Sequence, residues 1–392
     1  MVVSIEWARA SIIEVADARP GLQELVCRLE DGAEVLAVAY TELFGRLAPG
    51  AEVWLNTRAL SLGLGTGGVA FVVAPAGPDR PPPSPTPPGG PAPDPGRADE
   101  DSGFLVKARY TPLQVVRPGV DSPHSAHHEL LQQADSLEGM PVVVADLHSS
   151  LPAICAAIRH DADAPRGAGP RLVYIMTDGA ALPIAFSRTV ARLVADGTLA
   201  ATITAGQAFG GDFEAVSLHS ALLAARHVAK ADIAICVQGP GNLGSDTPWG
   251  FSGVAAGDAV NAIAALGGRP VGCLRVSGAD RRPRHRGLSH HSLIAYGRVA
   301  LAAADLALPI FTGDLAELGR MVEAAAAPLA ARHRLAPVAL DGLAGALGRT
   351  PGLSTMGRGF RDDPAAFLAA AAAGRLALSL LPGPVRPPGS AL

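Results

Sequence analysis

Cysteine is scarce in this sequence, and no two cysteines are close together. Cys27, Cys155, Cys236 and Cys273 are spread over 392 residues, and no CxxC pair occurs. The last two lie in apolar runs that are typical of strands. We therefore expect four buried thiols rather than disulfides or a cysteine-bound metal.

Lysine is almost absent too, since Lys107 and Lys230 are the only two. Most mechanisms that need a lysine Schiff base or a lysine–phosphate contact are therefore excluded. The 32 basic and 36 acidic residues give a net charge of -4, and aromatic residues make up only 4%. This composition predicts neither nucleic acid nor an anionic membrane as a partner.

Long apolar runs are also missing, because no stretch reaches the roughly 18 to 20 apolar residues that a membrane-spanning helix needs. The first ten residues, MVVSIEWARA, have no basic region that leads into an apolar one. We therefore expect no signal peptide and a cytoplasmic location. The hydrophobic content of 48% is ample for a sizeable core, and the length allows two domains.

Residues 1–74 are predicted to form a small β-barrel or β-sandwich, because short β-branched runs alternate there with turns. Eleven of the 21 residues from Pro75 to Pro95 are proline. Such a segment cannot pack into a core, so we expect residues 75–101 to be a disordered linker. The proline-rich tail, residues 381–392, is expected to be disordered as well.

From Met140 onward, apolar strands, polar loops and helices alternate. This pattern predicts an α/β domain over residues 102–380, with a mostly parallel sheet and helices on both faces. Asp363 is the expected N-cap of a last helix, with proline at its first position. The expected strands are 141–145, 171–176, 200–204, 232–237, 270–276 and 336–340, and the expected helices are 152–159, 183–195, 213–229, 257–266 and 364–378.

Five consecutive strands of this domain are followed by polar, glycine-rich loops. The carboxyl ends of parallel strands share one edge of the sheet, where α/β proteins bind ligands, so we predict one composite site there. Ser149, Ser150 and Asp212 have helix N-capping as an equally good explanation. The expected catalytic residues are His148, Asp178, His290 and His291. The expected ligand-binding residues are Ser149, Gly179, Gly210, Gly211, Asp212, Gly239, Gly241, Gly244, Thr247 and Arg286.

No familiar catalytic or nucleotide-binding motif fits the sequence. Residues 239–244 match GxGxxG, but the helix that a dinucleotide fold needs does not follow at once, and Ser245 replaces the lysine of a P-loop. Gln132 stands where a zinc protease needs its second histidine after His128, and no GxSxG elbow is present. What remains is a loop whose backbone N–H groups could hold a phosphate or carboxylate, together with the basic run 281–286.

A metal held across loops by His128, His148, Asp178 and His291 is a weaker alternative. The favoured interpretation of these four residues is that of hydrogen-bonded or solvated side chains. The sequence assigns no metal ligand and identifies no cofactor.

Short motifs along nearly the whole chain point to one family. They are LGLGTGG (62–68), YTPLQ (110–114), LEGMPVVV (137–144), MTDGAALP (176–183), AFGGD (208–212), GFSG (250–253), HRGLSHH (285–291) and STMGRG (354–359). With these motifs the sequence resembles the bacterial domain-of-unknown-function family 3866. The resemblance implies no activity. It implies that relatives commonly carry histidine where Gln207 stands, which counts against a metal in that loop, and that they lack the proline insertion.

The leading functional hypothesis is an enzyme that acts on a small anionic metabolite, phosphorylated metabolites included. In this hypothesis the glycine loop and an arginine bind the anion, and His148 or His291 pairs with Asp178 for proton transfer. One alternative is a module that senses a nucleotide or metabolite, or binds a partner, without turnover. Another is a metal-dependent hydrolase. A homo-oligomer is compatible with the sequence.

Overall fold

The computed structural model describes residues 6–57, 60, 68–76, 105–108, 115–162 and 169–381. Nearly all of the proline-rich segment and the C-terminal tail lie outside these residues, as do most of the motif at 62–68 and the motif at 110–114. The chain divides into two compact units. One contains residues 1–118 and 185–191, and the other contains residues 119–184 and 192–392.

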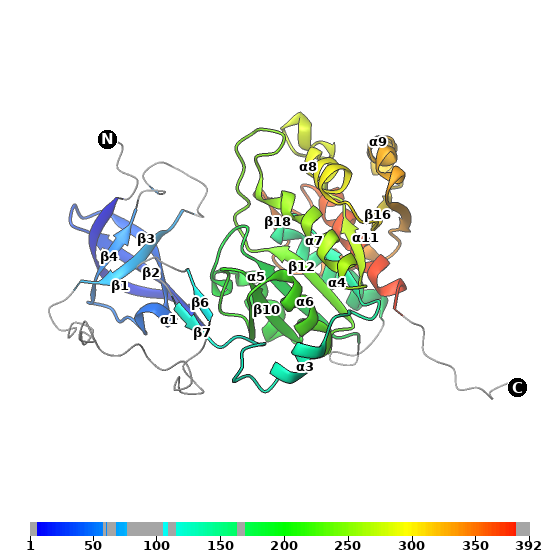
Figure 1. Ribbon diagram of the computed structural model, residues 1–392. Helices are drawn as coiled ribbons and strands as arrows, with labels where there is room; N and C mark the ends of the chain where they lie inside the picture. Colours follow the sequence, from blue (N-terminus) through cyan, green and yellow to red (C-terminus); the bar gives the residue numbers. More distant parts are fainter. Residues whose placement is uncertain are drawn as a thin grey trace, which may run out of the picture. The chain divides into compact units, whose positions relative to one another are not determined.

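The first unit contains a closed β-barrel, drawn in blue in Figure 1. Alternate residues are buried in β1 and β4, as in the pairs Ala10 and Ile12, and Val53 and Leu55, so one face of these strands points into the barrel core. The predicted small β-domain is confirmed, as a barrel. The strands run in the order β1 (Trp7–Arg19), β2 (Leu22–Leu29), β3 (Glu34–Tyr40), β5 (Ala70–Pro75) and β4 (Glu52–Asn56), and a short helix, α1 (Thr41–Phe44), follows β3. The same unit contains a two-stranded antiparallel sheet of β6 (Leu105–Lys107) and β7 (Val115–Arg117).

The second unit contains an eight-stranded sheet in which every neighbouring pair is parallel. The central strands are buried on both faces, as their continuous apolar sequences require. The expected parallel α/β fold is confirmed. The strand order is β11 (Phe213–Ala215), β10 (Ala201–Ala205), β9 (Leu172–Thr177), β12 (Ile233–Gln238), β8 (Pro141–Val144), β13 (Arg269–Cys273), β16 (Asp305–Ile310) and β17 (Arg334–Ala339).

Two groups of helices cover this sheet (Figure 1). Helix α11 (Pro364–Ser379) packs against α4 (Leu151–Asp161) and α10 (Leu343–Gly348), and also against strands of the sheet. Helix α6 (Leu218–His227) packs against α7 (Ala255–Ala265) and α3 (His128–Gln133). Right-handed crossovers place these groups on opposite faces. The remaining helices are α5 (Arg188–Ala195), α8 (His290–Ile294) and α9 (Ala316–Ala326).

The strand order creates a crevice at the carboxyl edge. After β8 the chain forms β9, β10 and β11 on one side of the sheet. It then returns to place β12 between β9 and β8, and continues to β13 on the other side of β8. The connections that leave β8 and β13 therefore go to opposite faces. Neighbouring strands whose connections diverge in this way form the ligand-binding crevice of α/β proteins.

Two differences from the sequence-based expectation concern edge strand β11 and internal strand β16 of the sheet. The segment 213–229 is not one helix, because Ser217 makes a capping box with Ser220 and starts α6 at Leu218, while residues 213–215 form the edge strand β11. Strand β16 was not expected at all. Its sequence, DLALPI, contains Pro309, and proline normally argues against an internal strand.

The four cysteines are buried and free, as expected. Burial raises the pKa of Cys155, Cys236 and Cys273 to about 12, so these thiols are poor nucleophiles. Among the described residues, no helix combines the length and the apolarity that crossing a bilayer requires.

Gly374 permits the close contact of α11 with α4. A Cβ atom at this position would lie 2.4 Å from the carbonyl oxygen of Ile154. We expect Gly374→Ala to lower the free energy of unfolding by about 1–3 kcal/mol, because the backbones must separate. Gly348→Ala, in open space at the end of α10, is the control and should be neutral or slightly stabilising. Urea denaturation measures both, and equal effects would contradict this packing.

Candidate active site at the carboxyl edge of the sheet

A cavity of about 170 Å³ lies at the carboxyl edge, beside the crevice between β8 and β13. Its walls come from the segments that follow β8, β12 and β13, together with Met356 from near the C-terminus, so residues far apart in the sequence meet there. The lining residues are Leu147, Asn242, Leu243, Gly244, Asp246, Thr247, Gly250, Arg275, Arg282, Arg284, His285, His290, His291 and Met356.

A buried cluster of Asp146, Arg275 and His291 lies at this crevice. Asp146 follows β8, Arg275 follows β13, and His291 is the second residue of α8. One Nη atom of Arg275 lies 3.3 Å from Asp146 Oδ2 and 2.8 Å from His291 Nδ1. His291 Nδ1 lies 3.4 Å from the same carboxylate oxygen. Asp146 is 7% exposed and His291 is 8% exposed, so these contacts are formed out of water.

The geometry of this cluster defines its protonation. A guanidinium group has no lone pair, so Arg275 donates and the Nδ1 of His291 accepts, which places the imidazole proton on Nε2. Burial raises the pKa of Asp146, but its polar and charged neighbours, Arg275 among them, outweigh burial and keep the pKa below its ordinary value. The carboxylate is therefore ionised at neutral pH.

Three histidines meet beside this cluster. The rings of His285, His290 and His291 lie with their centroids 4.5–5.0 Å apart. Phe251 stacks on His291 with a centroid distance of 3.6 Å and an interplanar angle of 5°. Ser289 sets the start of α8, since its Oγ accepts a hydrogen bond from the backbone N–H of His291. Burial lowers the pKa of His285 to about 3 and also lowers that of His290.

The three arginines that line the cavity each face a carboxylate. Arg275 contacts Asp146, as described above. Arg282 makes a two-pronged contact with the buried Asp280, and its hydrogen bonds hold the pKa of Asp280 far below its ordinary value. The Arg284 side chain pairs with Asp246, which is 72% exposed. Arg284 is thus the arginine whose partner exchanges most easily with a solute.

The expected catalytic residues separate into three places. His290 and His291 line the cavity. His148 packs against Tyr174, and its Nδ1 lies 3.3 Å from the carbonyl oxygen of Gln238. Asp178 is exposed and accepts a hydrogen bond from the backbone N–H of Gln207 at 2.9 Å. The carboxylate that contacts His291 is Asp146. The pairing of His148 or His291 with Asp178, and the catalytic role of Asp178, stay predictions.

The environment of His148 makes stability depend on pH. Burial lowers its pKa to about 4, and the hydrogen bond to Gln238 offsets only part of this. Between this value and the unfolded value of about 6.5 the unfolded chain binds more protons, so stability falls as the pH falls through that window. We expect His148→Gln to flatten the unfolding profile between pH 6.5 and 4 by up to about 3 kcal/mol. An unchanged slope, equal to that of His219→Gln, would contradict this assignment.

The glycine loop after β12, which begins at residues 239–244, is held by hydrogen bonds to the segment that follows it. Leu243 donates its backbone N–H to Ser252 Oγ at 3.1 Å, and Ser245 donates its own to the carbonyl of Gly250 at 2.8 Å. These two N–H groups are therefore not available to an anion, whereas Gly244 and Thr247 do line the cavity. Gly239 allows close packing, because a Cβ there would lie 2.6 Å from the carbonyl of Ala181, and Gly241 has a φ of +95°.

Other expected ligand-binding residues have partners within the protein. Gly210 donates its N–H to Glu214 and Gly211 to Thr204, and Asp212 accepts from the N–H and hydroxyl of Thr202. Asp212 therefore stabilises the turn before β11 and is not a helix N-cap. Gly179 lies against the side chain of Gln238, where a Cβ would come within 2.5 Å of Oε1.

The N-cap expectations for Ser150 and Asp363 need correction, whereas the ligand-binding roles of Ser149 and Arg286 stay predictions. Ser149 donates to Thr355 Oγ1 at 3.0 Å, and Ser150 makes no side-chain cap for α4. Asp363 occupies the N-cap position of α11, but its carboxylate instead accepts hydrogen bonds from Ser277, Gly278 and Arg358. Arg286 is exposed and does not line the cavity.

The metal alternative across loops also needs correction. His128 lies at the start of α3, where its Nδ1 lies 2.8 Å from the carbonyl oxygen of Asp121. Among the described residues, the group of three or more potential ligands that the fold brings together is His285, His290 and His291.

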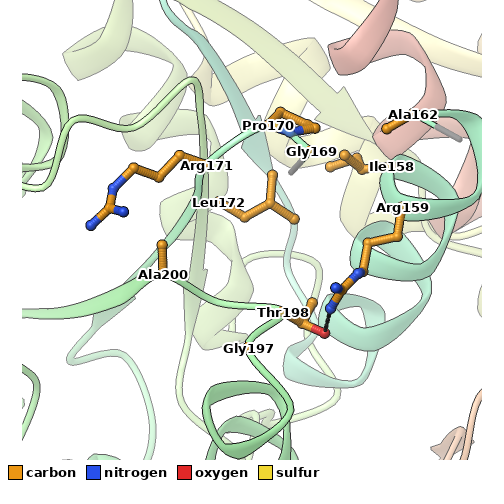
Figure 2. A pocket seen from close by; sticks show the side chains of 10 residues that line it. All are labelled: Ile158, Arg159, Ala162, Gly169, Pro170, Arg171, Leu172, Gly197, Thr198 and Ala200. Carbon is orange, nitrogen blue, oxygen red and sulfur yellow. Dashed lines mark hydrogen bonds between the residues drawn. The ribbon is translucent and has the colours of Figure 1, made fainter. Parts of the chain in front are cut away.

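A second cavity, also of about 170 Å³, lies at the amino ends of β9 and β10 (Figure 2). Arg159 donates to the hydroxyl of Thr198. The Arg171 side chain points away from these two residues and donates to the carbonyl of Ala229. Both guanidinium groups therefore already have partners. This cavity also lies at the edge where α/β proteins do not normally place their sites.

Three residues of this site, Asp146, Arg275 and Phe251, were not identified from the sequence as site residues. Arg275 lay within a run expected to be a strand, but β13 ends at Cys273. The signal for Asp146 was its place directly after the apolar run 141–145. No local pattern marks Phe251 as the neighbour of His291, because 40 residues separate them.

A family model with the description "Protein of unknown function (DUF3866)" matches residues 36–374. The match covers parts of both the barrel and the α/β unit. No curated protein and no solved structure matches the chain.

Proposed function

Since the chain belongs to the DUF3866 family, whose description assigns no activity, we propose its function from the site alone. The protein is an enzyme that acts on a small anionic metabolite at the carboxyl edge of the sheet. The observation that carries this proposal is the cavity lined by His291, with its buried partner Asp146, and by Arg284.

Arg284 is the residue proposed to bind the anion. An exposed ion pair contributes little free energy, so a phosphate or carboxylate of the metabolite can replace Asp246 at low cost. Arg275 and Arg282 are held by the buried carboxylates Asp146 and Asp280. These two arginines fix the shape of the site and leave Arg284 for the ligand.

His291 is the residue proposed to exchange a proton with the ligand. Its Nδ1 is engaged by Arg275 and Asp146, which leaves Nε2 for the ligand. A carboxylate beside an imidazole orients the ring and stabilises its protonated form, so the pair suits acid–base catalysis. Stacking on Phe251 fixes the plane of the ring.

A panel of phosphorylated and carboxylate metabolites tests this proposal. Binding is measured by calorimetry, and conversion of each bound compound is followed by mass spectrometry. Arg284→Gln should weaken binding of the active compound at least about tenfold, the value of one charge-assisted contact. Arg286→Gln, two residues away and outside the cavity, is the matched control and should leave affinity unchanged.

Equal affinities of the two variants would show that the anion binds elsewhere. Binding that depends on Arg284 without any conversion would assign the site to a sensing module instead of an enzyme.

A further inference from the structure

We propose that His285, His290 and His291 bind one divalent transition-metal ion, with Zn²⁺ as the ion that suits them. One ring nitrogen of each histidine lies within 4.8 Å of those of the other two. The inference goes beyond the proposed function and does not rest on it, because the three imidazoles can hold a metal whether or not a metabolite is converted.

Each of the three rings is oriented through its Nδ1 atom. His285 Nδ1 lies 2.7 Å from Ser289 Oγ, and His290 Nδ1 lies 3.4 Å from the carbonyl oxygen of Arg284. His291 Nδ1 contacts Arg275 and Asp146. Among the described residues, no hydrogen bond is recorded for any of the three Nε2 atoms. Metal-binding histidines have this arrangement, in which one nitrogen is held by a neighbour and the other binds the ion.

The spacing requires only a small adjustment. Zinc–nitrogen bonds of about 2.0–2.1 Å in a tetrahedron place ligand nitrogens about 3.3 Å apart. The ring nitrogens that lie within 4.8 Å of one another must therefore approach by up to about 1.5 Å. His290 is partly exposed and has the most room to move.

Metal binding changes the tautomer of His291. The Nε2 lone pair binds the ion, so the proton moves to Nδ1 and is donated to Asp146, 3.4 Å away. Arg275 then keeps its bond to Asp146 alone. The result is a carboxylate–histidine–metal triad, which strengthens the ligand and fixes its orientation.

The donor set selects the type of ion and leaves one position open. Three neutral imidazoles favour Zn²⁺, Co²⁺, Ni²⁺ or Cu²⁺ over Mg²⁺ or Ca²⁺, which prefer oxygen ligands. Three protein ligands with an open fourth position are typical of catalytic rather than structural zinc. A bound ion would occupy the Nε2 atom of His291, and its open fourth position would be where a water molecule or ligand atom is polarised.

Cobalt titration of the full chain, stripped of metal with a chelator, tests this inference. We expect one equivalent of Co²⁺ to bind with the visible absorption of a four-coordinate ion, and Zn²⁺ to displace it. His285→Gln and His290→Gln should each weaken Co²⁺ binding by more than about tenfold. His219→Gln, an exposed histidine on α6, should bind like the parent, and urea denaturation confirms that each variant is folded.

Failure to bind one equivalent of Co²⁺, or equal affinity of His290→Gln and His219→Gln, would overturn the metal site. Binding with the expected variant pattern supports it even if no metabolite is converted. Conversion of a metabolite by protein that binds no metal would support the proposed function and remove the metal from it, so the two failures can be told apart.

Discussion

Asp146→Asn is expected to lower the free energy of unfolding by about 3–5 kcal/mol, the cost of breaking one partner out of a buried ion pair. The side chains of Asp146 and Arg275 are each only 9% exposed. Neutralising Asp146 therefore leaves a guanidinium charge without compensation and away from water. Urea denaturation at pH 7.5 measures the loss.

Asp178→Asn is the matched control, since Asp178 also follows a strand of the same sheet but is exposed. Asparagine can still accept the N–H of Gln207, so the expected change is within about 0.5 kcal/mol. Adding Arg275→Gln to Asp146→Asn removes the uncompensated guanidinium charge. The double variant should therefore recover part of the lost free energy of unfolding, as a double-mutant cycle would show. Equal losses for Asp146→Asn and Asp178→Asn would contradict the buried pair.

The largest effect on activity is expected for His291→Ala, which should reduce conversion of the metabolite by about 10²–10⁴-fold, the range for a lost acid–base group. The residue lies in the cavity and stacks on Phe251, so the substitution removes its Nε2 atom, whether that atom exchanges a proton or binds a metal. Steady-state rates for the parent, His291→Ala and His219→Ala measure this. The loss should appear in kcat, and the control His219→Ala should keep the unfolding stability of the parent. A reduction below tenfold would show that His291 takes no part in the reaction.

The sequence predicts the general fold because its signals are local. The run Pro141–Val144 is apolar throughout, and it forms a strand buried on both faces. Asp146 directly follows this strand, and His290 and His291 line the cavity at the same carboxyl edge of the sheet. These features depend only on neighbours in the chain and on the shared edge of parallel strands.

The pairing within the site depends instead on the strand order, which no local pattern contains. Asp146 was not paired with His291 from the sequence because β12 returns to lie between β9 and β8, while β13 lies on the other side of β8. The same return separates Asp178, after β9, from the β8/β13 crevice. The sequence did not identify Arg275 as a site residue because it was expected to lie within the strand, whereas β13 ends two residues before it.

The most direct test of the account is a crystal structure of the protein with the metabolite that binds most tightly in the panel. The account predicts that the anionic group contacts Arg284 and that the reacting part lies beside His291, in the cavity at the carboxyl edge. A ligand in the cavity of Figure 2, at the amino ends of β9 and β10, or one that contacts neither Arg284 nor His291, would contradict it.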